Sequence, residues 1–173
     1  LHESRAAGLK ELGPWTTVYE GLSQLAPQAQ KSWLAFDHYY SDSAFTEALP
    51  HLFASTVNKM LDLGGNTGRW AIRCARYNAE VDITIADLPG QLGMAKKMID
   101  DAKFTQRIHT HPINFLELQN HTIPGEFDVV WMSQFLVCFS EKDIVQILKL
   151  ARRALKPGGR ILIMDTFWDA QNT

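Results

Sequence analysis

Residues 61–68 read Leu61-Asp62-Leu63-Gly64-Gly65-Asn66-Thr67-Gly68. This stretch decides the fold, because an apolar run precedes it and a helical pattern follows it, which places the glycines at a strand-to-helix turn. Glycine allows a tight turn and lets a ligand approach main-chain atoms without a Cβ in the way. The following helix would present its first N–H groups to polar ligand atoms. The stretch therefore predicts a ligand-binding loop, and an ordinary strand-to-helix turn is the alternative.

Strand and helix patterns alternate on both sides of this stretch, from residue 56 onward. The expected strands are 57–62, 81–86, a weaker one around 107–113, 127–132 and 160–165. The expected helices cover about 67–77, 91–102 and 140–155, and Ser140 caps the last with Asp143 three residues later. Apolar strands separated by amphipathic helices predict a parallel sheet covered on both faces. The predicted fold class is α/β, a Rossmann-like doubly wound parallel sheet that stops after its fifth strand.

The first 54 residues differ, because they read as helices and turns without strands. Pro27 suits a first helical turn, and one helix face then carries Ala29, Trp33, Phe36 and Tyr40. The polar run 41–43 offers caps for a further short helix. We therefore expect a helical segment over 1–54 and an α/β core over 55–173.

Composition narrows the class of partner. The 173 residues carry a net charge of −2 without a run of Lys or Arg, which argues against nucleic acid or an anionic membrane. Cys74 and Cys138 form no CxxC pair, so a reduced, cytoplasmic protein is expected. No apolar stretch approaches the ~20 residues of a membrane helix. Because the chain does not begin with Met, we expect it to be part of a larger protein.

Two carboxylates support a nucleotide-like ligand. Asp87 follows the second expected strand, about 20 residues after the glycine turn, where dinucleotide-type folds bind both ribose hydroxyls. The alternative for Asp87 is a turn-forming role before Leu88 and Pro89. Asp62 ends the first strand and would place a carboxylate near a cationic amino group.

Other ligand classes fit the sequence less well. In the G-x-G-x-x-G pattern of NAD sites, Leu63 takes the place of the first glycine, so an NAD-dependent oxidoreductase is only an alternative. A phosphate-binding P-loop is excluded, because no Gly-Lys-Ser/Thr follows the glycines. We expect no metal, since His109, His111 and His121 lack zinc-ligand spacing.

The D-x-G-G-x-x-G form resembles the first motif of class I S-adenosylmethionine-dependent methyltransferases. Segments 127–130 and 155–163 resemble the fourth and fifth strands of that superfamily, and 19–22 and 33–36 resemble interdomain helices of its small-molecule O-methyltransferases (caffeic acid and hydroxyindole type). In that group a longer glycine run stands at Gly64-Gly65. The resemblance implies S-adenosylmethionine as cofactor and methyl transfer to a small-molecule hydroxyl. It also implies a homodimer in the full-length protein, a preceding winged-helix domain and two further strands.

The resemblance assigns roles residue by residue. The cofactor contacts fall on Asp62, Gly64, Gly65, Gly68, Asp87, Leu88, Asn114, Phe115 and Ser133. Of these, Asp87 would bind ribose, Asn114 and Phe115 would frame the adenine, and Ser133 stands where a Lys is usual. Phe36 and Tyr40 match positions that line the acceptor pocket, with a helix face packed into the core as the alternative.

The catalytic positions depart from the group. Its phenol-methylating members place a His-Asp pair where this chain has Val137 and Cys138. Valine cannot take a proton, so the catalytic residues are unknown, with His38 as the candidate base and a surface histidine as the alternative. We expect Cys138 to be a small buried filler. These departures leave a non-catalytic cofactor-binding or regulatory protein as a second alternative.

Overall fold

The computed structural model describes residues 10–15, 17–119 and 121–167. The chain divides into two compact units, residues 1–48 and 49–173, and the division falls inside helix α2 (Pro27–Leu52). Each unit is described by itself.

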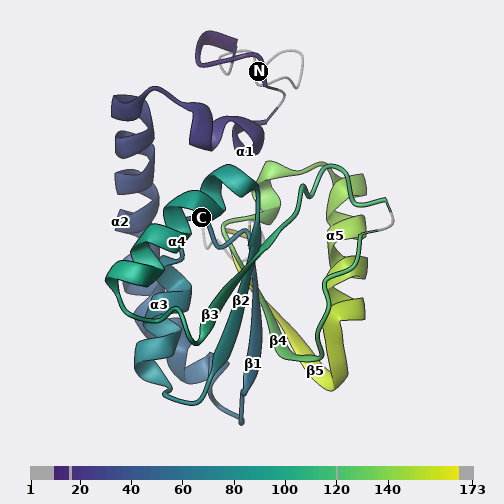
Figure 1. Cartoon of the computed structure of the whole chain (residues 1–173). Coiled ribbons are helices and arrows are strands. Elements are labelled where there is room, and N and C mark those ends of the chain that lie inside the picture. The colour runs from purple at the N-terminus through teal and green to yellow at the C-terminus, as the bar shows by residue number, and fades with distance from the viewer. Residues whose placement is uncertain (1–9, 16, 120, 168–173) are drawn as a thin grey trace. The chain divides into compact units, whose positions relative to one another are not determined.

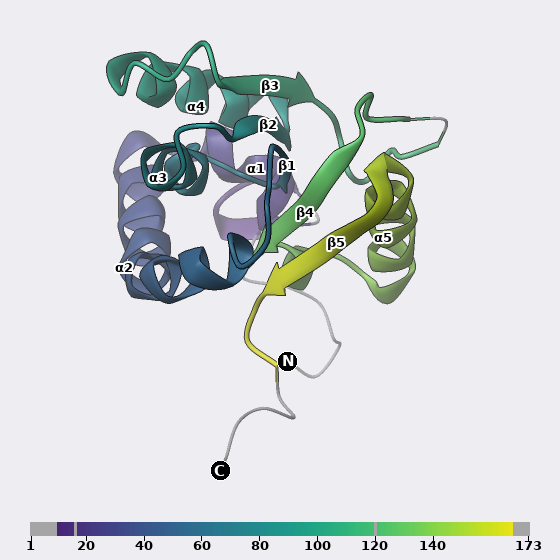
Figure 2. The same ribbon diagram turned by 90° about the horizontal axis from the view of Figure 1, so that it is seen from below.

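The larger unit is built on a five-stranded, all-parallel sheet in the order β3-β2-β1-β4-β5 (Figures 1 and 2). Its strands are β1 (Lys59–Leu63), β2 (Asp82–Asp87), β3 (Ile108–Pro112), β4 (Phe127–Ser133) and β5 (Leu155–Met164). The strand order reverses between β1 and β4, and in open α/β sheets ligands bind outside the carboxyl ends at such a switch point. The predicted α/β class and parallel sheet are confirmed.

Helices cover both faces of this sheet. Helices α3 (Arg69–Tyr77) and α4 (Pro89–Asp101) lie on one face and α5 (Glu141–Ala154) lies on the other (Figure 2). Double cover explains why six of the seven β4 residues are buried. Ser140 caps α5 as expected, because its Oγ accepts the Asp143 amide at 3.3 Å. Among the described residues, every helix is too short or too polar to cross a bilayer.

The amino ends of the central strands are tied together by Asp128 of β4. Its carboxylate accepts the backbone amides of Asn58 and Lys59, both at 2.8 Å, and forms an ion pair with Lys156. The side chain is 8% exposed. Three segments far apart in the sequence therefore share one buried acceptor at this end of the sheet.

A second long side chain ties the loops at the same end. The Arg107 guanidinium donates to the carbonyl oxygens of Ala75 at 2.6 Å and Asn78 at 3.0 Å. Because the last carbonyls of a helix lack intrahelical donors, Arg107 completes the carboxyl end of α3.

The start of β5 differs from the prediction. The expected strand began at residue 160, whereas β5 begins at Leu155, directly after α5. Leu155 already pairs with Phe127, and the register then shifts before Val129 pairs with Arg160. Gly158, at φ +79°, adopts the left-handed conformation within this irregular stretch. The glycines therefore lie within an irregular stretch of the strand, where its register with β4 shifts.

The smaller unit contains α1 (Val18–Gly21), the 3-10 helix η2 (Leu22–Gln24) and most of α2. The predicted helix break at 41–43 is wrong, because α2 runs through it. The Ser41 hydroxyl donates to the Asp37 carbonyl oxygen at 2.7 Å, one turn earlier in the same helix. A serine that bonds back in this way continues a helix and does not cap a new one.

Candidate functional site

The glycine loop lies at the switch point, between β1 and α3. Gly64 and Gly68 have φ values of +71° and +75°, a region that other residues enter only with strain. The Gly64 amide donates to the Ala86 carbonyl oxygen at 2.9 Å, which fixes the loop to the end of β2. The Gly68 amide donates to the Gly65 carbonyl oxygen at 2.8 Å and closes the turn into α3. The structure therefore brings the predicted glycines together above the central strands.

Asp62 lies directly beneath this loop. A Cβ on Gly65 would stand 2.6 Å from its Oδ2, so only glycine leaves room there. Asp62 is 2% exposed, and its Oδ2 has no hydrogen-bond partner among the described residues. Burial raises the pKa of Asp62 to about 8, and the neighbouring Asp87 charge raises it further. The protonated form of this carboxyl group is therefore favoured at neutral pH.

Asp87 joins the end of β2 to the glycine loop. Its Oδ2 accepts the Asn66 amide at 2.9 Å and its Oδ1 accepts the Leu88 amide at 2.7 Å. Burial raises the pKa of Asp87 to about 6, although these two amide bonds act in the opposite direction. The structure therefore brings Asp87 into direct contact with the glycine loop.

An aromatic cluster made of Phe115, Phe135 and Phe139 packs against the loop. The Phe135 ring lies 4.9 Å from Phe115 and 4.8 Å from Phe139 between centroids, in edge-to-face geometry. A Cβ on Gly64 would stand 2.2 Å from the Phe135 ring. The sequence analysis identified Phe115 and missed Phe135. The residues around a buried phenylalanine in the sequence do not indicate which distant residue it contacts.

The remaining predicted cofactor positions lie at the carboxyl ends of β3 and β4. The Ile113 amide donates to the Asp87 carbonyl oxygen at 2.9 Å, which places Asn114 next to the end of β2. The Asn114 side-chain oxygen accepts the Leu116 amide at 3.1 Å and keeps a second lone pair for a ligand. Ser133 is the last residue of β4 and is half-buried.

The segment after β4 holds the positions where the resembling group has its catalytic pair. Val137 and Cys138 lie in the 3-10 helix η3 (Leu136–Cys138). The Val137 side chain is 70% exposed. Cys138 is half-buried, so the expectation of a buried filler is not met in full.

The predicted acceptor residues and the candidate base lie in the smaller unit. Phe36, His38 and Tyr40 all belong to α2. Phe36 is 64% exposed and His38 is half-buried, while the Tyr40 side chain lies outside the described part of the structure. Their assignment to an acceptor pocket stays a prediction.

A tryptophan pair lies on the same sheet face as Asp62. Trp131 stands opposite Asp62 in the register of β1 and β4. Its ring stacks on Trp70, in the first turn of α3, with centroids 4.4 Å apart and planes 23° from parallel. Both residues are 3% exposed.

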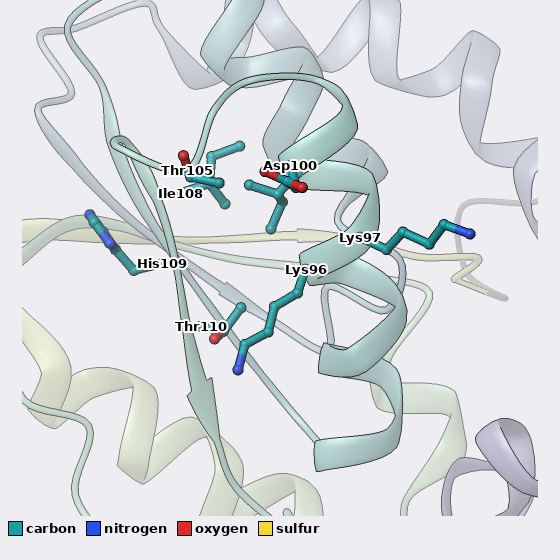
Figure 3. A pocket seen from close by; sticks show the side chains of 8 residues that line it. Lys96, Lys97, Asp100, Thr105, Ile108, His109 and Thr110 are labelled. Atoms are coloured by element: carbon teal, nitrogen blue, oxygen red, sulfur yellow. The ribbon is translucent and has the colours of Figure 1, made fainter.

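An open groove of about 760 Å³ lies away from the switch point, between α4 and the edge strand β3. Figure 3 shows Lys96 extending toward Thr110, whereas Lys97 points away from it. His109, at the groove, lies 3.1 Å from the Asp82 carboxylate.

His111 lies in the same strand as His109. Burial lowers the pKa of His111, and its electrostatic interaction with His121 lowers that pKa further. Within the described ranges no group of three or more metal-ligating side chains forms.

Comparisons with known proteins agree with this geometry. The family model described as O-methyltransferase domain matches residues 33–173. The L-tyrosine C(3)-methyltransferase of Streptomyces lavendulae is 25% identical over 167 residues, which cover 96% of this chain and 44% of that protein. The aclacinomycin 10-hydroxylase RdmB of Streptomyces purpurascens is 32% identical over 111 residues, covering 64% of this chain and 29% of that protein.

A solved structure matches nearly the whole chain. The S-adenosylmethionine-dependent methyltransferase SibL, in its apo form, superposes with a TM-score of 0.75 at 26% identity. The match covers 96% of this chain and 48% of SibL. The chain therefore spans less than half the length of these relatives.

Proposed function

The chain belongs to the O-methyltransferase domain family, and we propose that it binds S-adenosylmethionine at the switch point for methyl transfer to a hydroxyl oxygen of a small molecule. The observation that carries this proposal is the unpartnered Asp62 Oδ2, buried beneath the glycine loop. A buried polar group without a partner is rare in folded proteins. A ligand that ends in an ammonium group supplies the missing donor.

The residues at the switch point fit this cofactor. Asp62 would accept an N–H of its ammonium group, and the main chain of the glycine loop, at positions 64, 65 and 68, would lie against its amino acid end. Asp87 and the adjoining Leu88 would face the ribose. Asn114 and Phe115 would frame the adenine, and Ser133 would lie near its edge. The bound cofactor supplies a methyl group that is already activated by its sulfonium sulfur.

The charges at the loop support a ligand with a cationic end. The carboxyl groups of Asp62 and Asp87 are both buried there, and the Asp87 charge raises the pKa of Asp62. A cation beside them would be attracted, and the methyl donor carries one in its amino acid end. The nicotinamide alternative is disfavoured by Leu63, which takes the place of the first glycine of the NAD pattern.

The proposed contribution of the protein to catalysis is mainly positioning. Holding the donor and acceptor in line can supply ~7 kcal/mol or more of the barrier. Val137 has no ionisable group, so proton transfer at that position is excluded. We propose His38 as the base that accepts the acceptor's hydroxyl proton, with Phe36 and Tyr40 lining the acceptor pocket. Replacing His38 with Ala would then lower the rate by about 10²–10⁴-fold.

The decisive experiment is a calorimetric titration of the whole protein with S-adenosylhomocysteine and with NAD, side by side. We expect binding of the first and none of the second, and tighter binding of NAD would refute the proposal. Turnover is then tested with phenolic acceptors by product mass. Because one relative is named for hydroxylation, the assay separates a gain of one CH₂ from a gain of one oxygen.

We also propose that the whole protein is a cytoplasmic homodimer that does not act on nucleic acid. The near-neutral net charge of −2 and the absence of a CxxC pair support the location and the partner class. The dimer rests on the family resemblance. Residues 1–54 are the proposed helical cap segment and 55–173 the cofactor-binding core. Light scattering of the purified whole protein tests the dimer directly.

A further inference from the structure

Asn66 belongs to the glycine loop, and the proposed function gives its side chain no role. Its φ of +48° lies in the left-handed region, which Asn adopts more readily than most non-glycine residues. Its side-chain oxygen Oδ1 is buried and accepts no hydrogen bond from the described residues. An unpartnered buried polar atom is rare and calls for a partner from outside the protein.

The missing partner of Oδ1 must be a hydrogen-bond donor, because an amide oxygen only accepts. The neighbours of Asn66 indicate which donor. Its backbone amide donates to the Asp87 Oδ2 at 2.9 Å, so the two residues are in contact. Asp87 accepts the Leu88 amide on its other oxygen and keeps further lone pairs on both.

The ammonium end of a ligand already has an acceptor elsewhere. Asp62 Oδ2 is also without a hydrogen-bond partner among the described residues, and it lies under Gly65. Two hydroxyl groups on adjacent carbons, by contrast, offer two donors side by side. The Asp87 carboxylate can accept one of them, and Asn66 adjoins that carboxylate through its backbone amide. We infer that the Asn66 side-chain oxygen accepts one ribose hydroxyl of the cofactor, beside the Asp87 carboxylate. This inference rests on the proposed function.

The conformation of Asn66 provides a clean test, because glycine adopts the same φ without strain. Asn66→Gly therefore removes the acceptor and leaves the backbone conformation accessible. Lys103→Gly is the matched control, since Lys103 also has a positive φ, +62°, but follows α4, away from the glycine loop. Both variants are made in the whole protein, and their melting temperatures are compared with that of the wild type.

The affinities of S-adenosylhomocysteine and 5′-methylthioadenosine are then measured by calorimetry. The second probe keeps the ribose and lacks the amino acid end. We expect Asn66→Gly to weaken both by the same factor, about 3- to 10-fold, which corresponds to one lost neutral hydrogen bond. We expect Lys103→Gly to change neither. The 2′-deoxy and 3′-deoxy forms of 5′-methylthioadenosine are tested in the same way. One of them should bind Asn66→Gly and wild type equally well, because it lacks the hydroxyl group that Asn66 accepts.

The outcomes separate this inference from the function on which it rests. A wild-type protein that binds neither probe overturns both. A wild type that binds, with Asn66→Gly affinities equal to wild type, overturns only the role of Asn66. Weakening confined to S-adenosylhomocysteine also overturns it, because Asn66 would then serve the amino acid end.

Discussion

The sheet buries carboxyl groups at both of its ends, and the two ends surround them differently. At the amino ends, Asp128 accepts two backbone amides at 2.8 Å and pairs with Lys156. Burial acts to raise the pKa of Asp128, but Lys156 and the two amides outweigh it and hold that pKa below its ordinary value. At the carboxyl ends, burial raises the pKa of Asp62 to about 8 and that of Asp87 to about 6.

The difference shows what each end does. Asp128 is 8% exposed, whereas Asp62 and Asp87 are each 2% exposed, and Asp128 has the Lys156 cation beside it. The lower burial and the Lys156 charge together keep the Asp128 carboxyl group ionised. The amino end satisfies Asp128 within the protein, which stabilises the fold. The carboxyl end leaves Asp62 with an acceptor that no described residue uses. A strongly perturbed carboxyl group beside a ligand loop marks a binding site.

The largest effect is expected from Asp128→Ala, which should lower the free energy of unfolding by about 3 kcal/mol. The change leaves two buried amides and Lys156 without their acceptor. Because the pKa of Asp128 is depressed, its contribution is present above the unfolded value near pH 4 and is lost as the pH falls further. Urea denaturation measures the loss. Asp128→Asn, which keeps an acceptor, is the control and should lose less.

At the other end, Asp87→Ala should act on binding. A charge-assisted bond to ribose hydroxyls is worth ~1.5–3 kcal/mol, so affinity for S-adenosylhomocysteine should fall about 10- to 100-fold. Calorimetry on the folded variant measures it, with Asp128→Asn as the control that keeps wild-type affinity. Equal affinity of Asp87→Ala and wild type would mean that Asp87 only forms the turn. The contrast between a binding end and a structural end of the sheet would then be wrong.

Asp62→Asn should change how the free energy of unfolding depends on pH, which Asp128→Asn tests at the other end of the sheet. With its pKa raised to about 8, folded Asp62 keeps its proton after the unfolded chain has lost it near pH 4. Wild-type stability from this group is therefore lost as the pH rises from about 4 to about 8. Asp62→Asn should be more stable than wild type by about 1–2 kcal/mol at pH 8, with a smaller difference at pH 4. A stability difference that stays constant with pH would mean that Asp62 is already ionised when folded.

The smallest effect is expected from Val137→Ala. The side chain is 70% exposed and carries no ionisable group, so the pH profile of methyl transfer should keep its shape. The rate should change by less than about twofold, since exposed substitutions away from special features are usually worth within ±0.5 kcal/mol. Steady-state rates of the whole protein across pH test this. A lost limb of the profile would show that the η3 segment positions the base.

The sequence was most informative where function depends on strand ends. Asp62 is the next-to-last residue of β1 and Asp87 is the last residue of the neighbouring parallel strand β2, so their meeting at the glycine loop follows from topology alone. The continuity of α2 through Ser41 did not follow, because a serine hydroxyl can cap a new helix or bond back along the old one.

Long-range contacts were beyond the reach of local patterns. The Arg107 guanidinium donates a hydrogen bond to the Ala75 carbonyl oxygen, 32 positions earlier in the chain. No sequence pattern near either residue predicts this hydrogen bond. The same holds for Phe135 over Gly64, which the spacing of aromatic residues alone did not identify. The acceptor oxygen of Asn66 became visible only when its surroundings in three dimensions left it without a donor.

The stacked Trp70 and Trp131 give the molecule a built-in optical reporter. One indole belongs to the helix that starts at the glycine loop, and the other stands beside Asp62 in the sheet register. Two indoles at 4.4 Å couple their electronic transitions, so their near-ultraviolet circular dichroism depends on their mutual geometry. Any movement of the first turn of α3 against β4 would alter that signal without a chemical label. Events at the loop can therefore be followed in real time from the light that the protein itself absorbs.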